Sequence, residues 1–404
     1  MIGRRSSILP PILPPILLAL GLVIWFSGWV GRRSTLVIYS FTDTDEESMG
    51  NLNFFISEAI RGDQRASYVI SVNGRVDGLP MLPRNSRYVL NPTADECLSD
   101  WAAYGHGLRE SKVDRYRSFI FISSSARGPF LPSYAHHSRA HWTDPFLNRL
   151  RGDVKLVGPT ISCEGSFTDE TVGKGRWRGN PYVGGHALAT DLEGLKVLLA
   201  DGEVFKCHRN KWEASYYGEV GASTAILASG FNLDSFVTKY QGSFEAPMDW
   251  RDKSRWECNG RQSIHGEFML DGVTVDPLEV EFVKFSRNAL IKGISSAVKA
   301  EKYTRWLKET RDRRRGIKTN ISSNEYQDQS HKFRLPKVLE AKARGSACFD
   351  FQFYAEHEKN QDLQDADTGK ARLSESELWN HFVHHGQFEA RAYRFNCPYD
   401  DSGQ

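Results

Sequence analysis

The chain has 404 residues, of which 25% are charged, and its formal net charge is +2. This balance provides no global field that would attract nucleic acid or a strongly acidic partner. The length allows a large core and more than one domain. Six cysteines are spread along the chain without Cys-x-x-Cys spacing, which argues against zinc or thioredoxin-type sites. An even number fits disulfides in an oxidising compartment, but the pairing cannot be derived from the sequence.

The N-terminal segment from Ile8 to Val30 is uncharged and mostly apolar, with basic pairs on both sides. Prolines interrupt its first part, so only Ile16 to Val30 can form a regular helix. Such a run predicts either a cleaved signal peptide or a single-pass anchor. Because no small-x-small cleavage site precedes Arg32, we expect residues 1–33 to be a cytoplasmic tail and transmembrane signal anchor. The body would then be lumenal, as in type II proteins of the Golgi or endoplasmic reticulum membrane.

Short apolar runs alternate with helix-competent segments in the next part of the chain. Thr35 to Ser40 predicts a buried strand, Ser48 to Arg61 an amphipathic helix, and Ser67 to Asn73 a second strand. Further strands are predicted at 87–90, 119–122 and 154–159. Strands that alternate with helices indicate a doubly wound, Rossmann-like α/β domain, which we place at residues 34–290.

The strand from Phe119 to Ile122 is followed by three serines, Ser123 to Ser125, and then by Arg127, Gly128 and Pro129. Ligands of open α/β sheets bind beyond the carboxyl ends of the strands. Small hydroxyls and an arginine at such a place can donate hydrogen bonds to a phosphate. The alternative is that this serine-rich stretch is simply a turn.

Other polar residues allow two interpretations as well. Tyr39 ends the first strand, and Asp95 and Asp100 lie in a loop that runs into a helix, so all three could border a ligand. Glu219 begins a helical segment, where a carboxylate also acts as a cap and is favoured by the helix dipole. The stretch from Gly165 to Gly185 has no hydrophobic period and is expected to be a flexible loop.

The C-terminal third has a different composition. Residues 291–345 are expected to form a basic helix and a polar linker, and the linker contains the glycosylation sequon at Asn320. Residues 346–404 have the aromatic spacing of a small helical hairpin. Its three histidines, His381, His384 and His385, have no cysteine or carboxylate at ligand spacing, so we interpret them as surface or core residues.

A series of short motifs between Thr35 and Arg287 occurs in the order found in one known family. They are Tyr39-Ser40, Asn51-Leu52 with Phe54-Phe55, Asn91, Asp100-Trp101-Ala102, Phe119 to Pro132, Trp142 to Phe146, Val154 to Cys163, Glu219-x-Gly221-x-Ser223 and Pro277 to Arg287. By these motifs the chain resembles the membrane-anchored glycosyltransferases related to bacterial rhamnan- and capsule-synthesis enzymes. The resemblance implies a GT-A-like fold that transfers a sugar from a nucleotide-sugar donor to a glycan or glycoconjugate acceptor. The C-terminal segment separately resembles a short helical module that accompanies some polysaccharide-related proteins, which implies attachment or interaction.

The resemblance also implies roles for individual residues. Most such folds carry an Asp-x-Asp motif that holds Mn²⁺ or Mg²⁺ against the diphosphate. Ser123, Ser124 and Ser125 stand at those positions, so no metal ligand is assigned and the need for a cation is left open. The phosphates would instead contact basic side chains. The implied donor site comprises Tyr39, Asp95, Asp100, Ser123, Ser124, Ser125, Arg127, Lys284 and Arg287, and Glu219 is the implied base that takes the acceptor proton.

The missing carboxylates also fit a second hypothesis, a catalytically inactive, membrane-anchored carbohydrate-binding or scaffold protein of the same fold. If the chain is an enzyme, we expect Glu219, Ser124 and Arg127 to converge on one cleft. A secreted hydrolase has no support, because the sequence contains no Gly-x-Ser-x-Gly elbow.

Overall fold

The structure is a computed structural model that describes residues 35–60, 65–74, 76–91, 99–137, 141–168, 176–208, 210–242, 248–252, 263–315, 345–365, 368–386 and 391–396. The chain divides into two compact units, Met1–Arg311 and Asp312–Gln404. The predicted anchor (8–30), Asp95 and Asn320 lie outside the described residues. Within the described ranges, no helix has the length and apolar character needed to cross a membrane.

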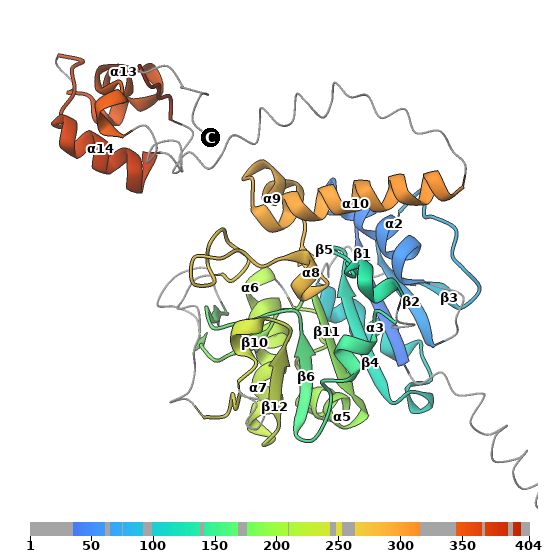
Figure 1. The fold of residues 1–404 in the computed structure, drawn as a ribbon. Helices are drawn as coiled ribbons and strands as arrows, with labels where there is room; N and C mark the ends of the chain where they lie inside the picture. Colours follow the sequence, from blue (N-terminus) through green and yellow to red (C-terminus); the bar gives the residue numbers. More distant parts are fainter. Residues whose placement is uncertain are drawn as a thin grey trace, which may run out of the picture. The chain divides into compact units, whose positions relative to one another are not determined.

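The first unit is built on a seven-stranded sheet with the order β12-β6-β11-β4-β1-β2-β3 (Figure 1). All neighbours are parallel except β11, which is antiparallel to β4 and β6. The predicted α/β class with a mostly parallel sheet is therefore confirmed, and the predicted strands are present with small shifts at their ends. The strands are β1 (Thr35–Thr42), β2 (Ala66–Asn73), β3 (Ser86–Asn91), β4 (Ser118–Ser123), β6 (Val154–Gly158), β11 (Ala187–Asp191) and β12 (Asn232–Ser235).

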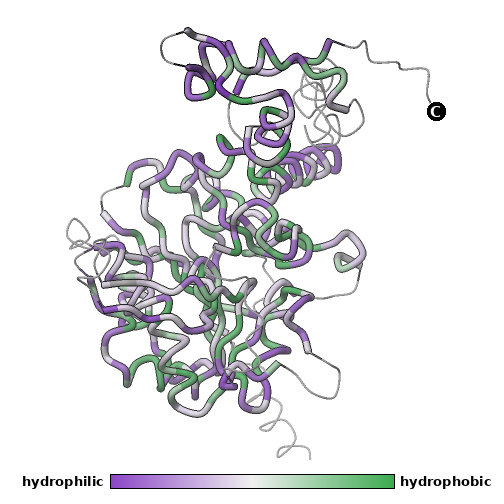
Figure 2. Tube along the Cα trace, turned by 90° about the vertical axis from the view of Figure 1, so that its left-hand side faces the viewer, coloured by the Kyte–Doolittle hydropathy of each residue, from purple (hydrophilic) through white to green (hydrophobic). Residues whose placement is uncertain are grey.

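The central strands are covered by helices and form the core. All eight residues of β1 are buried, and so are all residues of β4 except Ser118. Such uninterrupted burial explains why both strands are continuous apolar runs in the sequence. The hydrophobic part of the trace gathers in the middle of this unit (Figure 2). The packed helices are α2 (Ser48–Ala59), α3 (Asp100–Arg109), α5 (Leu192–Asp201) and α7 (Val220–Ala228).

The order of the strands reverses between β1 and β4. From β1 the chain builds outward through β2 and β3, and it then returns to place β4 on the other side of β1. The carboxyl ends of β1 and β4 therefore lie next to each other at a topological switch point, where open α/β sheets bind ligands. Because β11 is antiparallel, its amino end also lies at this edge, and Ser123 N donates to His186 O over 2.9 Å.

The stretch predicted as a flexible loop, Gly165 to Gly185, is ordered in its described parts. It contributes β8 (Ser166–Phe167), β9 (Trp177–Arg178) and β10 (Tyr182–Val183), of which β8 pairs with β9 and β10 pairs with β7 (Ile161–Ser162). In these described parts the expected loop contains three strands, which the sequence did not reveal because two-residue strands are too short to show a hydrophobic period.

The remaining elements of this unit are short, except for one long helix. The basic helix, predicted from Ala289 to Arg315, is interrupted near Gly293, whose φ of +68° favours a break. The long helix is α10 (Ser295–Arg314). The short elements are β5 (Ala126–Arg127), α4 (Asp144–Leu147), α6 (Lys211–Glu213), the π-helix η4 (Ala214–Glu219), α8 (Pro277–Val280), β13 (Val283–Lys284) and α9 (Arg287–Ile291), with 3₁₀ turns η2 (Val113–Arg115), η3 (Ser133–His137) and η5 (Thr238–Tyr240).

The second unit has its own small aromatic core, which includes Phe349, Tyr354 and Phe382. Its elements are η7 (Ser346–Cys348), α13 (Phe351–Glu356), η8 (Glu358–Leu363) and α14 (Glu375–His384). The Nδ1 atom of His381 lies 2.9 Å from the Tyr354 hydroxyl, so this histidine is used in the packing of the module. Among the described residues, no group of three or more His, Cys, Asp or Glu could hold a metal ion.

Candidate active site

A cavity of about 500 Å³ lies at the switch point of the sheet. Five separate segments supply the residues that matter for its chemistry. This is the place where an open α/β sheet is expected to bind a ligand. The wall includes Asp100 and Trp101 of α3, Ser125 after β4, Gly185 and His186 before β11, Glu219 of η4 and Lys284 of β13.

Asp100 is the first residue of α3, where the helix dipole favours a negative charge. Ser123 Oγ donates to Asp100 Oδ2 over 2.8 Å and lies 2.8 Å from Ser125 Oγ. Burial raises the pKa of the Asp100 carboxyl above its usual value, and the charge of Glu219 raises it further, against the opposing effects of Ser123 and Lys284. Asp100 and Glu219 thus place two carboxylates in one cavity.

Tyr39, which was expected to border the donor, does not line the cavity. The side chain is 1% exposed, and its hydroxyl has no hydrogen-bond partner among the described residues. Burial raises the pKa of the Tyr39 phenol, and the charge of Asp100 adds to the effect. Tyr39 therefore stays neutral and adds no charge to the site.

Glu219 stands at the junction of the π-helix η4 and α7, and π-helical turns are frequent at functional sites. Its Oε1 accepts a hydrogen bond of 2.7 Å from Gly185 N, while Ser223 Oγ accepts one of 3.0 Å from Val183 N. Between them, a Cβ on Gly221 would lie 2.9 Å from Arg178 Nη1. The Glu-x-Gly-x-Ser pattern therefore fixes the chain before β11 against α7, and it orients the carboxylate at the cavity.

Trp101 closes one side of the cavity and is 5% exposed. A Cβ on Gly218 would lie 2.5 Å from Trp101 Cδ1, and one on Gly185 would lie 3.3 Å from Trp101 Nε1. Real Cβ atoms essentially never show a 2.5 Å contact, so the indole takes its place only because residue 218 is glycine.

Two lysines line the cavity, Lys211 and Lys284, and Lys284 acts on two buried, neutral histidines. Burial lowers the pKa of His186 to about 3, and the charge of Lys284 lowers it further. The ring of His265 lies 4.8 Å from that of His186, centre to centre, and burial likewise lowers the pKa of His265. His186 Nδ1 is buried and has no hydrogen-bond partner among the described residues.

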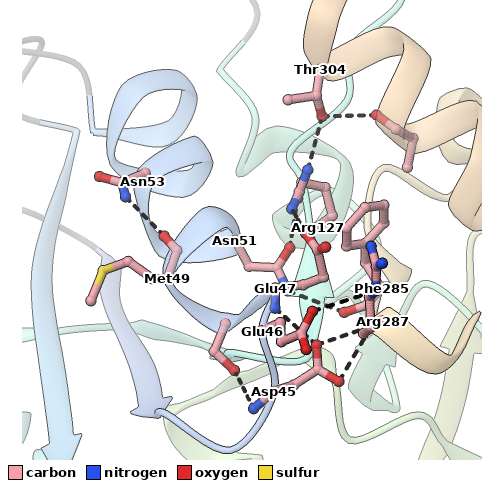
Figure 3. A network of polar contacts seen from close by, with 12 residues as sticks. Asp45, Glu46, Glu47, Met49, Asn51, Asn53, Arg127, Phe285, Arg287 and Thr304 are labelled. Atoms are coloured by element: carbon pink, nitrogen blue, oxygen red, sulfur yellow. Dashed lines mark hydrogen bonds and ion pairs between the residues drawn. The ribbon is translucent and has the colours of Figure 1, made fainter. Parts of the chain in front are cut away.

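Arg127 was expected to contact the donor, but it does not line the cavity. Its side chain lies in a network of polar contacts within the fold (Figure 3). Its Nε donates to Asn51 Oδ1 over 2.5 Å, Nη2 forms an ion pair of 3.3 Å with Glu47, and the guanidinium lies 3.8 Å from the centre of the Phe285 ring. These contacts use the cation to join α2 to the segment that carries β13.

Ser124 and Arg287 also lie outside the cavity wall. Ser124 Oγ donates to Thr42 O over 3.2 Å and so joins β4 to β1. The backbone N of Arg287 donates to Asp45 Oδ1 over 3.0 Å, and its half-exposed side chain faces Glu46 (Figure 3). The expected convergence of Glu219, Ser124 and Arg127 is therefore wrong. After β4, Ser125 is the residue that reaches the cavity, because Ser123 and Ser124 are used in contacts within the fold.

The described residues give a divalent cation only a partial set of ligands. Asp100 and Glu219 supply carboxylates, and no third His, Cys, Asp or Glu completes a cluster in these parts of the chain. One or two carboxylates suit Mg²⁺ or a similar ion that takes its other ligands from substrate phosphates and water. The residues therefore fit a cation that arrives with a phosphate ligand, with Asp100 as the carboxylate beside the serine hydroxyls.

The sequence interpretation missed Gly185 and His186, and it gave no role to Trp101. Trp101 belongs to one of the quoted motifs, and the Gly184-Gly185-His186 sequence lies directly between two short strands. A pair of glycines beside a histidine was the available signal, since glycine allows a close approach of the backbone to a ligand or side chain.

No protein-family model and no curated protein matches the chain. Among solved structures, it is similar to the mannosyltransferase PcManGT from Pyrobaculum calidifontis in complex with GDP-Man and Mn²⁺, with 13% identity over 54% of this chain and 62% of that one and a TM-score of 0.32. It is also similar to the catalytic domain of Drosophila β1,4-galactosyltransferase 7 in complex with xylobiose, with 10% identity over 50% and 64% of the two chains and a TM-score of 0.28. A mutant of that enzyme with manganese, UDP-Gal and xylobiose gives 9% identity and the same TM-score. These values are too low to carry an argument about this chain.

Proposed function

We propose that the protein is a glycosyltransferase that transfers a sugar from a nucleotide-sugar donor to a glycan or glycoconjugate acceptor. The observation that carries the proposal is the meeting of Asp100, Glu219 and Lys284 in one cavity at the switch point of a mostly parallel sheet. The ordered motifs between Thr35 and Arg287, including Glu219-x-Gly221-x-Ser223, support the same activity.

In this proposal Glu219 takes the proton from the acceptor hydroxyl while the acceptor oxygen bonds to the anomeric carbon of the donor sugar. The bond from that carbon to the phosphate oxygen breaks, and the leaving nucleoside diphosphate gains negative charge. Lys284 compensates that charge, and Ser125 Oγ supplies a polar contact. A divalent cation, if bound with the donor, would supply further charge compensation beside Asp100.

The location of the protein is part of the proposal. We infer a single-pass type II anchor within residues 1–33 and a lumenal body in the Golgi or endoplasmic reticulum, where Asn320 would be accessible to glycosylation. Cys163, Cys207 and Cys348 are all disulfide-bonded, which supports an oxidising compartment.

The test compares the full-length protein with its Glu219→Gln variant. Glutamine keeps an oxygen that can accept from Gly185 N, so the fold is retained, but it cannot take a proton. We expect release of nucleoside diphosphate in the presence of acceptor to fall by about 10² to 10⁴, while the thermal shift caused by nucleoside diphosphates is retained. Glu193→Gln is the matched control, because Glu193 is 60% exposed on α5 and pairs with Lys155.

Two results would contradict the proposal. Full turnover by Glu219→Gln would remove Glu219 as the base. Wild-type protein that binds no nucleotide and transfers no sugar would leave the inactive carbohydrate-binding protein as the better hypothesis.

A further inference from the structure

A second cavity, of about 890 Å³, adjoins the first. Lys211 and Ser215 line both cavities, so the two spaces share a wall. The second cavity is more aromatic, because Trp177 and Trp212 form part of its lining. Its size falls in the range of roughly 300–1,000 Å³ that is typical of sites for small organic ligands.

The Trp177 side chain is partly exposed, and its ring packs closely against two glycines. It is 46% exposed, although a large apolar side chain gains by burial. A Cβ on Gly165 would lie 2.4 Å from Trp177 Cη2, and a Cβ on Gly179 would lie 2.9 Å from its Nε1. The indole therefore rests directly on the backbone at two glycines. A ring held in this way exposes apolar surface to a ligand with little loss of side-chain entropy on binding.

The second cavity combines this aromatic surface with polar groups. Glu164 Oε1 accepts a hydrogen bond of 2.6 Å from the Tyr182 hydroxyl, and Lys211 Nζ lies 5.2 Å from the centre of the Trp212 ring. A pyranose has an apolar face of C–H groups and a rim of hydroxyls. The C–H face suits the electron-rich face of an indole, and the hydroxyls suit carboxylate and ammonium groups. The lining therefore matches a carbohydrate.

The two cavities are joined by one continuous segment of chain. Lys211, Trp212 and Ser215 precede Glu219 within α6 and η4. Arg178, the neighbour of Trp177, donates from Nη1 to Tyr216 O over 3.0 Å and stacks on the Tyr216 ring at 4.3 Å. The strand that carries Trp177 is thus fixed to the turn that carries Glu219, and a ligand on the indole has a defined position relative to that carboxylate.

We propose that the second cavity binds the acceptor as an oligosaccharide of two or more sugar units. Trp177 and Trp212 contact the sugar rings, and the terminal unit passes Ser215 to present a hydroxyl to Glu219. The orientation of the glycan toward Glu219 rests on the proposed transferase function. Binding of the glycan itself does not depend on catalysis.

The experiment applies the fluorescently labelled full-length protein to an array of defined glycans, and the strongest ligand is then titrated. We expect Trp177→Ala and Trp212→Ala to weaken glycan binding about tenfold each, as expected for loss of an aromatic contact with its buried area. Trp306→Ala is the matched control, because Trp306 is 43% exposed on α10 and lines neither cavity. The thermal shift with nucleoside diphosphates should be unchanged in all three variants.

The proposal is wrong if no glycan on the array binds, or if the Trp177 and Trp212 variants bind as well as wild type. It is also wrong if these variants lose nucleotide binding instead, because the cavity would then hold the nucleobase of the donor. Glycan binding without nucleotide binding would contradict the transferase function and keep the glycan site. Nucleotide binding without glycan binding would contradict the glycan site and leave the transferase function in place.

Discussion

Arg127 offers the sharpest test of how the cavity is supported, because sequence and structure assign it different roles. From the sequence it was a phosphate ligand, whereas in the structure its cation is used between Asn51, Glu47 and Phe285 (Figure 3). We therefore expect Arg127→Met to lower stability without removing nucleotide binding from the protein that remains folded.

The expected loss of stability depends on how deeply the partners of Arg127 are buried once the arginine is removed. The Arg127 side chain is 6% exposed and that of Glu47 is 23% exposed. Removal of one partner of a buried ion pair costs about 3–5 kcal/mol, and the partial exposure of Glu47 places this pair at the lower end. Asn51 Oδ1 also loses the hydrogen bond that Arg127 Nε donates, but the methionine side chain fills most of the space that the arginine occupied. We expect a loss of about 3 kcal/mol, which is a fall in Tm of roughly 6–12 °C for a unit of this size.

The assay is urea unfolding of full-length Arg127→Met and wild type, followed by fluorescence, together with the thermal shift caused by nucleoside diphosphates. Arg287→Met is the control, because that side chain is 54% exposed and its pair with Glu46 is long at 3.4 Å. Such a surface pair is worth about 0–1 kcal/mol. Unchanged stability of Arg127→Met with loss of the nucleotide shift would refute the structural role and restore the phosphate contact.

Two further predictions concern a glycine and a buried carboxyl. Gly218→Ala should push Trp101 out of the cavity wall, cost about 1–3 kcal/mol and weaken the nucleotide-induced thermal shift; an unchanged shift would show that Trp101 does not border the ligand. Burial, together with the charge of Asp144, raises the pKa of Glu281 well above its usual value. The folded protein therefore keeps this proton while the unfolded chain loses it, so stability falls as pH rises from about 4.5, by at most about 1.4 kcal/mol per pH unit. Urea unfolding at pH 5 and pH 8 should show a smaller fall in Glu281→Gln than in wild type, and equal falls would mean that Glu281 ionises in the fold.

Strands and candidate site residues that are marked by a short local pattern could be predicted from the sequence. The apolar runs that became β1 and β4 are visible because central strands are buried throughout. Asp100 and Glu219 were identified from the quoted motifs, and both line the cavity. Asp100 begins α3 as predicted, but Glu219 does not begin a helix, because α6, η4 and α7 follow one another without a loop. In each case the residue type and the local sequence that positions it lie within a few residues of each other.

Residues that act through long-range contacts could not be predicted. The partners of Arg127 are 76 and 80 residues away in the sequence, so no local pattern shows that its charge is already used. Trp177 lies in a strand of two residues, and its exposure depends on Gly165 and Gly179, whose closeness to the ring is a property of the hairpin. For such residues, the side chain alone does not distinguish a core position from a ligand contact.

The contrast between Arg127 and Lys284 shows how the fold selects which cation faces the cavity. The two residues come from paired strands, since Lys284 lies opposite Ala126 and Val283 lies opposite Arg127. Successive side chains of a strand point to opposite faces, so the register of this two-residue pair puts Arg127 among the residues of α2 and leaves Lys284 at the cavity. A shift of one residue would exchange the faces and bury Lys284. The contribution of Lys284 to the cavity is therefore determined by the pairing of β5 with β13, and the contacts of Arg127 with α2 hold that pairing in place.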